Sequence, residues 1–459
     1  MRISLINKPE IVFVILALIF GLVFVVINQP LAVSDECPHF YKAFDVSQGH
    51  LIPQSQIIQM PMSIVILSAV FTLTEPTNFT KIYSYLQQPL NINETYNVNV
   101  SNIAIYPPLP YLASGAVIFL GSLSNSSPLF LMYLGRLINL LIYIVLVYFA
   151  IKIIPVHKYV LFLVALMPMT LYQAASLSAD SLNLGLCFLT ISFFLCLALV
   201  KDKISNKDIL ISLILVFALS FSKQAYAIAT LLIFMIPKEK FEKRFNRLIS
   251  FFIILLPSLI TTIYWNHLFK HLYHAPILDG LLTSPEYNIH FILSNPLNLP
   301  TILINTLICD FMNCYITQFV GFFRYPYSSL PFSLAVLFCI FLVLVSLLDN
   351  FKYKLSFKQK LIPLFIFSMV SFLVFLFEFI SYTPIGYTKI VGVQGRYFIP
   401  IIPLFLLLFY NTKLSNYLSS RFMSKVLNNK LKANFVSSLY IFVILFLMVS
   451  SYIIYYAVK

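Results

Sequence analysis

Charged residues are scarce in this sequence. They make up only 10% of the chain, while hydrophobic residues make up 60% and the mean hydropathy is +0.90. A soluble domain of 459 residues would carry far more charge on its surface. The composition therefore excludes a soluble globular protein. It predicts an all-α, polytopic membrane protein in which residues 1–459 form a single integral-membrane domain.

Cysteine and acidic residues are also few. The six cysteines include no Cys-x-x-Cys pair, so no metal-ligand or redox motif is present. Lys and Arg number 30 against 16 Asp and Glu, which gives a formal net charge of +14. In a membrane protein such an excess is typical of cytoplasmic loops that fix the orientation of the chain. We therefore expect no nucleic-acid partner.

Apolar runs separated by short polar segments predict about eleven membrane crossings. They are expected at residues 10–28, 129–150, 159–176, 181–200, 208–222, 224–237, 247–265, 330–348, 360–381, 397–410 and 435–458. With the N-terminus in the cytoplasm, the main basic clusters all fall in cytoplasmic loops, as the positive-inside rule requires. Residues 57–73 and 107–121 are short or interrupted by proline, and we expect them to lie along the membrane surface. If both crossed, the chain would have thirteen crossings.

This arrangement gives two large extracytoplasmic loops, residues 29–128 and 266–330. The first opens with the motif Ser34-Asp35-Glu36-Cys37-Pro38-His39, directly after the first predicted span. Ionisable side chains at such a position indicate a functional site, although a solvated helix end would also explain them. Six of the seven histidines also fall on the outer side. We expect any chemistry on that side.

Several motifs occur in a fixed order along the chain. They are Asp35-Glu36-x-x-His39, Tyr106-Pro-Pro-Leu-Pro-Tyr-Leu, Gly135-Arg-Leu-Ile-Asn139, Ser176-Leu-Ser178-Ala-Asp180, Ser222-Lys223 and Gly395-Arg-Tyr-Phe-Ile-Pro400. From about residue 10 to 410 this succession resembles a family of predicted membrane proteins that looks like part of the GT-C superfamily of integral-membrane glycosyltransferases. The resemblance implies a GT-C-like helical bundle, an acidic active-site residue in the first outer loop and a lipid-phosphate sugar donor held by cationic residues.

Sugar transfer from such a donor needs a base for the acceptor hydroxyl and fixed positive charge for the departing phosphate. Asp35 is the first choice for the base and Glu36 the second. His39 is expected to orient these carboxylates or to bind acceptor hydroxyls. Arg396 offers a planar fork that matches phosphate oxygens, whereas Lys223 would act as a point charge.

Three further residues complete the predicted substrate-binding set: Asp180, Arg136 and Tyr397. Asp180 can equally cap the helix that follows it, and Lys223 can snorkel or pair with Asp180. Arg136 can pack against the surface helices instead of touching substrate. The prolines of residues 106–111 indicate a structural helix entry.

The sequence assigns no metal ligand. A divalent metal held by Asp35, Glu36 and one of three histidines remains an open alternative, although no tight ligand motif is present. Those histidines are His267, His271 and His274.

The predicted function is an inverting glycosyltransferase of cell-envelope glycan biosynthesis. It would move a sugar from a polyprenyl-phosphate donor to a glycan, lipid or protein acceptor, outside a bacterial inner or plasma membrane. A polysaccharide polymerase or ligase that uses the same kind of donor is one alternative. A lipid or solute transporter is another, although the sequence shows no internal repeat of the kind that transporters carry.

Overall fold

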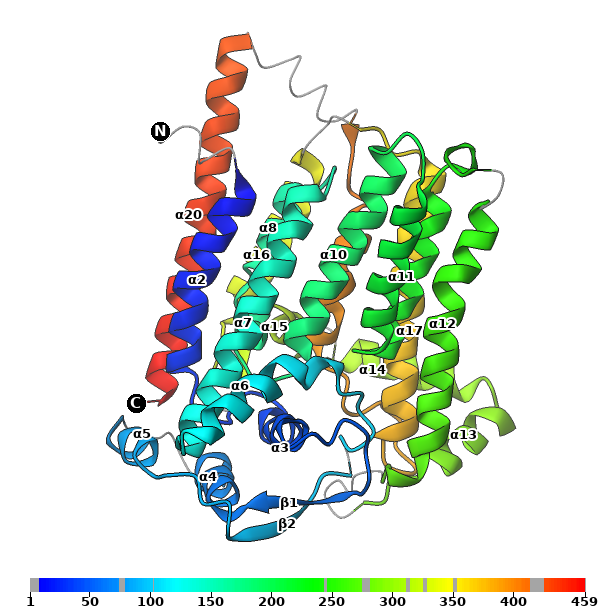
Figure 1. Ribbon diagram of the computed structural model, residues 1–459. Helices are drawn as coiled ribbons and strands as arrows, with labels where there is room; N and C mark the ends of the chain where they lie inside the picture. The colour runs from blue at the N-terminus through cyan, green and yellow to red at the C-terminus, as the bar shows by residue number, and fades with distance from the viewer. Residues whose placement is uncertain are drawn as a thin grey trace.

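A computed structural model describes residues 8–73, 79–101, 103–242, 246–274, 281–310, 314–324, 328–349, 353–412 and 425–458. Long helices run side by side as a bundle, and shorter elements gather below one end of it (Figure 1). In the described ranges the only strands form two small antiparallel sheets, so the predicted all-α class is confirmed.

Within those ranges, six helices are long and apolar enough to cross a membrane. They are α2 (Pro9–Ile27), α7 (Pro128–Ile153), α10 (Asp180–Leu199), α12 (Arg247–Phe269), α17 (Phe357–Ser381) and α20 (Lys425–Val458). A seventh crossing exists only if α13 (Pro285–Ser294) and α14 (Asn298–Asp310), bent by 111° at their junction, count as one span. The chain is a multi-pass integral membrane protein.

The prediction of eleven to thirteen crossings is therefore wrong. Several predicted spans are broken helices, because proline cannot continue the backbone ladder. Residues 159–176 split into α8 (Lys158–Ala165) and α9 (Pro168–Ala174), and residues 397–410 into the 3-10 helix η6 (Gly395–Ile401) and α18 (Ile402–Leu406). Others are too short: α11 (Asn206–Ser220), the 3-10 helix η2 (Gln224–Met235) and α16 (Phe332–Leu348) have 15, 12 and 17 residues, against about 20 for a span.

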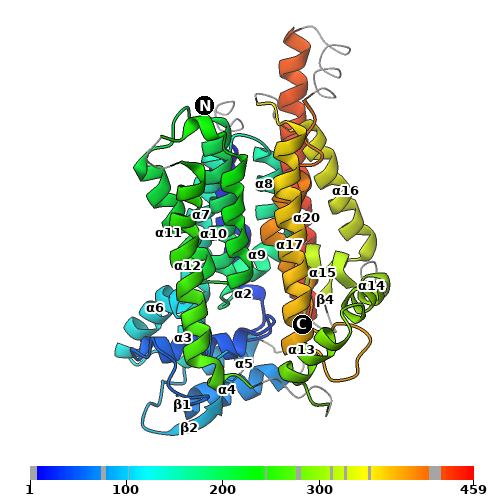
Figure 2. The same ribbon diagram turned by 90° about the vertical axis from the view of Figure 1, so that its right-hand side faces the viewer.

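The first predicted outer loop folds into short elements beneath the bundle (Figures 1 and 2). Along the chain they are α3 (Glu36–Ser47), β1 (Ile57–Pro61), α4 (Met62–Leu73), α5 (Phe79–Leu86), β2 (Thr95–Asn99), η1 (Leu109–Tyr111) and α6 (Leu112–Leu123). Strand β1 pairs antiparallel with β2, with Ile57 opposite Asn99. At 12 residues, α4 and α6 are each about 18 Å long, too short to cross a bilayer alone.

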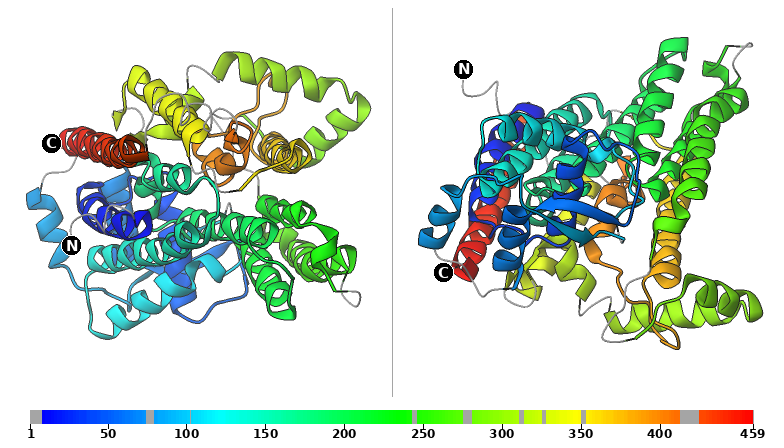
Figure 3. Two further views of the ribbon diagram at one scale, coloured as in Figure 1. Left: turned by 90° about the horizontal axis from the view of Figure 1, so that it is seen from above. Right: turned by 60° about the horizontal axis from the view of Figure 1, so that its bottom comes forward.

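Short elements also connect the later helices. They are η3 (Lys238–Lys240), η4 (Lys270–Leu272), α15 (Ile316–Val320), β3 (Phe322–Arg324) and β4 (Ser328–Ser329). The loops that join α7 to α8 and α10 to α11, and the described residues 238–242 that precede α12, lie at the end of the bundle where α2 begins (Figure 1). These loops contain basic clusters of the sequence. Helix α3 and the two-stranded sheet of β1 and β2 lie at the opposite end (Figure 3, right).

Candidate functional site

Asp35 lies in the turn that joins α2 to α3, at the end of the bundle opposite the basic loops. Its φ of 64° is in the left-handed region, which is uncommon for a residue with a side chain and is often found at functional sites. The Asp35 carboxylate is 55% exposed and accepts a hydrogen bond from Arg396 Nη2 at 2.8 Å. The structure thus joins two predicted site residues that are 361 positions apart.

Arg396 reaches Asp35 because η6 packs directly on α15. The backbone N–H of Gly395 donates to Gln318 Oε1 at 2.9 Å. A Cβ on Gly395 would overlap the carbonyl oxygen of Tyr315 and lie 2.7 Å from the backbone nitrogen of Phe319. Only glycine permits this approach, which fixes the position of the guanidinium.

Replacing Gly395 by Ala is expected to push η6 away from α15 and to lower stability by about 1–3 kcal/mol. The measurement is the melting temperature of the purified variant in detergent. Gly21→Ala is the matched control, because its added Cβ meets only the side chain of Leu140 and no backbone atom. Equal melting temperatures for Gly395→Ala and the wild type would show that η6 does not depend on this close approach.

A second ion pair joins Lys223 and Asp180, with Nζ 3.2 Å from Oδ1. Lys223 lies in the turn between α11 and η2, and its Nζ is 4.5 Å from the ring centroid of Tyr397. Asp180 is the first residue of α10 and binds Lys223, so its side chain does not cap the helix. An amide pair between Gln224 and Asn266, at 2.9 Å in both directions, holds this turn against α12.

His39 borders these charges from α3. Its Nδ1 is 2.7 Å from the hydroxyl of Tyr111, and its ring centroid lies 6.1 Å from that of Tyr106. Burial lowers the pKa of His39, so the imidazole is neutral at pH 7 despite the nearby carboxylates of Asp35 and Asp180. Burial also raises the pKa of the Tyr111 hydroxyl, so that group keeps its proton.

Residues 106–111 therefore contribute side chains to the site as well as shaping a helix entry. Trp265 Nε1 donates to the carbonyl of Ile105 at 2.7 Å and so fixes the backbone beside Tyr106. The prolines favoured a purely structural interpretation of this segment, so Tyr106 and Tyr111 at its ends were not predicted as site residues. The signal that could have found them is the placement of polar aromatic side chains beside rigid backbone.

Glu36 and Arg136 lie apart from this cluster and are completely buried. Glu36 accepts three hydrogen bonds: from Arg136 Nε at 2.7 Å, from Arg136 Nη2 at 2.6 Å and from the Leu177 backbone at 2.9 Å. The remaining Arg136 donors go to the carbonyls of Val25, Asn28 and Gln29. All five guanidinium N–H groups are thus satisfied. This pair connects the end of α2 to α3, α7 and residue 177.

All the residues of this site lie in the part of the chain that matches one known family. Residues 18–405 match the family described as Predicted membrane protein (DUF2142). The chain belongs to this family. No curated protein and no solved structure matches this DUF2142 chain. The matches do not extend to the GT-C superfamily, so that resemblance stays a prediction.

In the described part of this DUF2142 chain, the residues of the alternative metal site do not lie together. In the part of the chain that the structure describes, no three His, Cys, Asp or Glu side chains lie together as a metal site would require. Both carboxylate oxygens of Glu36 accept hydrogen bonds from Arg136, and Glu36 is buried whereas Asp35 is exposed. The three histidines are exposed near the end of α12: His267, His271 and His274.

Glu378 is the charged residue that the sequence analysis missed. It lies in the last turn of α17, where the charges of Lys223, Asp35 and Arg396 act on it. No motif surrounds it. The one available signal was an acidic residue near the end of an otherwise apolar helix.

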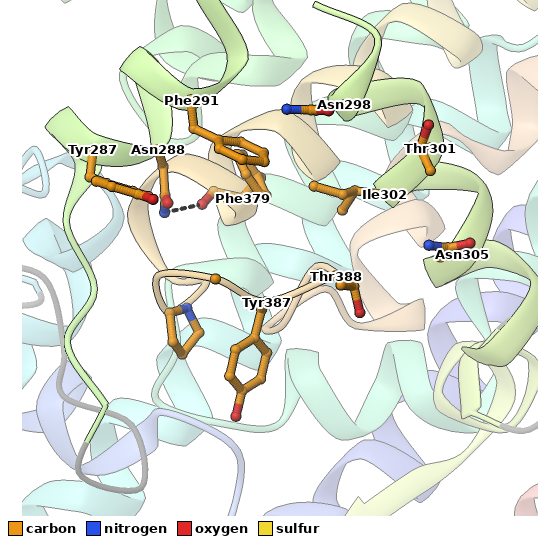
Figure 4. Close-up of a pocket in the computed structure, with 12 residues that line it drawn as sticks. Tyr287, Asn288, Phe291, Asn298, Thr301, Ile302, Asn305, Phe379, Tyr387 and Thr388 are labelled. Atoms are coloured by element: carbon orange, nitrogen blue, oxygen red, sulfur yellow. Dashed lines mark hydrogen bonds between the residues drawn. The ribbon is translucent and has the colours of Figure 1, made fainter. Parts of the chain in front are cut away.

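Two cavities border the segment that leads from α17 to Arg396. The smaller, of about 240 Å³, is lined by residues of α13, α14 and α17 together with Tyr387 and Thr388 (Figure 4). The larger, of about 580 Å³, is lined by Asp310, Gln318 and residues 386–393. Neither cavity is lined by Asp35 or Arg396, so the charged cluster does not form the wall of either one.

Proposed function

We propose that this DUF2142 protein is an inverting glycosyltransferase that uses a polyprenyl-phosphate sugar donor. The observation that carries the proposal is the incomplete hydrogen bonding of Arg396. Its side chain is 4% exposed, and Nε and Nη1 make no hydrogen bond of normal geometry to the described residues, although the side chain of Tyr397 lies beside the guanidinium. Burying donors without a partner costs about 1–3 kcal/mol per group, so the site is suited to an anionic oxygen ligand.

The other charges fit the same reaction. Lys223 adds positive charge for a departing phosphate, and the exposed carboxylate of Asp35 lies beside Arg396. The acceptor hydroxyl would give its proton to Asp35 while its oxygen forms a bond to the anomeric carbon. The bond from that carbon to the phosphate oxygen would break, and polyprenyl phosphate would leave with the electron pair. Attack opposite the phosphate inverts the anomeric centre.

Orientation supports an extracytoplasmic site. The basic loops lie at the end of the bundle where α2 begins, and the cluster lies at the other end (Figure 1). By the positive-inside rule, the N-terminus would then be cytoplasmic and Asp35 would face the outside. A polyprenyl donor would keep its tail in the bilayer while its phosphate reached Arg396.

A polymerase or ligase reaction would use the same cluster and differ only in the acceptor. The transporter alternative is less well supported. Transporters place polar binding groups near the middle of the membrane, whereas Asp35, Arg396, Lys223 and Asp180 gather where α2 ends and α10 begins.

The test is release of free polyprenyl phosphate from candidate lipid-linked sugars by the purified protein. Arg396→Lys keeps the charge but loses the planar fork, so we expect kcat/KM to fall about 10–100-fold. Lys389→Met is the control. Lys389 lies in the wall of the larger cavity, so this variant loses a positive charge outside the charged cluster. Full activity of Arg396→Lys would argue against a phosphate site there, and no release from any lipid-linked sugar by folded protein would refute the proposed function.

A further inference from the structure

Among the described residues, Glu378 is the carboxylate of the cluster that contacts neither Arg396 nor Lys223. Asp35 pairs with Arg396, and Asp180 pairs with Lys223. Over the described ranges of the chain, the Glu378 carboxylate has neither a hydrogen-bond partner nor an ion-pair partner. It is nevertheless subject to the charges of Lys223, Asp35 and Arg396. Glu378 is therefore close to both cations without contacting either.

The backbone around Gly392 holds Glu378 in this position. A Cβ on Gly392 would lie 2.6 Å from Glu378 Oε2, so the carboxylate rests against the backbone of the segment that leads to Arg396. The φ of Gly392 is +95°, a conformation that favours glycine. Glycine at this position leaves the space that the Glu378 carboxylate occupies.

The charges of the cluster do not balance when Glu378 is ionised. Three carboxylates then face two cations: Asp35, Asp180 and Glu378 against Arg396 and Lys223. An anion bound at Arg396 would add a further negative charge. Asp35 and Asp180 would keep their contacts with cations, whereas Glu378 has no contact to offset the added repulsion. A nearby negative charge favours the protonated form of a carboxyl group.

We propose that Glu378 takes up a proton when a phosphate anion binds at Arg396, so that donor binding is coupled to proton uptake. One proton would move from solvent to the Glu378 carboxylate on binding and return to solvent when the anion leaves. This inference rests on the phosphate site of the proposed function.

Other titratable groups near Glu378 do not replace it in this role. Burial raises the pKa values of Tyr106, Tyr273 and Tyr382, so these hydroxyls stay protonated at neutral pH. Helix α13 also packs against α17, but its exposed Glu286 and His290 are not among the charges that act on Glu378. The remaining neighbours are the two ion pairs and Tyr397.

The experiment uses farnesyl methyl phosphate, a phosphodiester whose single negative charge does not change between about pH 5 and about pH 9. Binding to the full-length protein in detergent is measured by calorimetry in two buffers that differ in ionisation enthalpy. For the wild type we expect uptake approaching one proton per anion where free Glu378 is ionised. The affinity should fall by up to about tenfold per pH unit there.

Glu378→Gln is expected to bind without proton uptake and more tightly than the wild type at high pH. Glu286→Gln removes an acidic group of α13 and should behave as the wild type does. Wild-type binding without proton uptake, or unchanged uptake in Glu378→Gln, would overturn the inference while leaving the phosphate site intact. Arg396→Met is expected to lose binding. If the wild type itself failed to bind the phosphodiester, the phosphate site of the proposed function would fail, and this inference with it.

Discussion

Asp35→Asn is expected to reduce turnover about a hundredfold or more while leaving phosphate binding close to the wild-type value. Asparagine keeps the shape of the side chain and still accepts a hydrogen bond from Arg396, but it cannot take the acceptor proton. It also tolerates the left-handed backbone at this position, where φ is 64°. Release of polyprenyl phosphate measures turnover, and farnesyl methyl phosphate measures binding.

Asp45→Asn is the control for this variant. Asp45 lies on α3, where it contacts His50 at 2.8 Å and Lys42 at 3.9 Å, so the substitution removes a carboxylate outside the charged cluster. If Asp35→Asn kept full turnover in folded protein, Asp35 would only hold Arg396 in place. The catalytic interpretation of the first outer loop would then be wrong.

Glu36→Gln is expected to lower the free energy of unfolding by about 3–5 kcal/mol, because it leaves the buried Arg136 without a counter-charge. The measurements are melting temperature and the yield of folded protein. Glu94→Gln, on the exposed surface of the first outer loop, is the matched control. Turnover per folded molecule should stay near the wild-type value. If Glu36→Gln abolished transfer while Asp35→Asn stayed active, the base would be Glu36.

The sequence placed Asp35, Glu36 and His39 together at the end of the first span, but their side chains go to three different places. Asp35 points to Arg396, Glu36 points inward to Arg136, and His39 contacts Tyr111. Spacing along the chain could not show this. The left-handed turn at Asp35 separates it from the helix that carries the other two.

Hydropathy predicted which segments are apolar better than it predicted which segments form continuous helices. Hydropathy does not distinguish α10, an unbroken helix of 20 residues, from η2, a 3-10 helix of 12. For Asp35 and Arg396, 361 positions apart, the distribution of charge along the sequence predicted a shared side of the membrane but not their contact. Glu378 has no neighbouring motif, so only the folded chain could place it among the other charges.

The buried Arg136 also constrains how the protein is made. An unmatched arginine costs about 2.5–3.5 kcal/mol on insertion at the centre of an apolar helix, and less toward its ends; Arg136 lies in the first half of α7. Its counter-charge, Glu36, lies 100 residues earlier, in a segment that would cross the membrane before α7 is synthesised. During synthesis, α7 should therefore be retained at the insertion machinery until residues 25–36 have folded against it. The insertion of α7 into the membrane then depends on its pairing with the end of α2 and the start of α3.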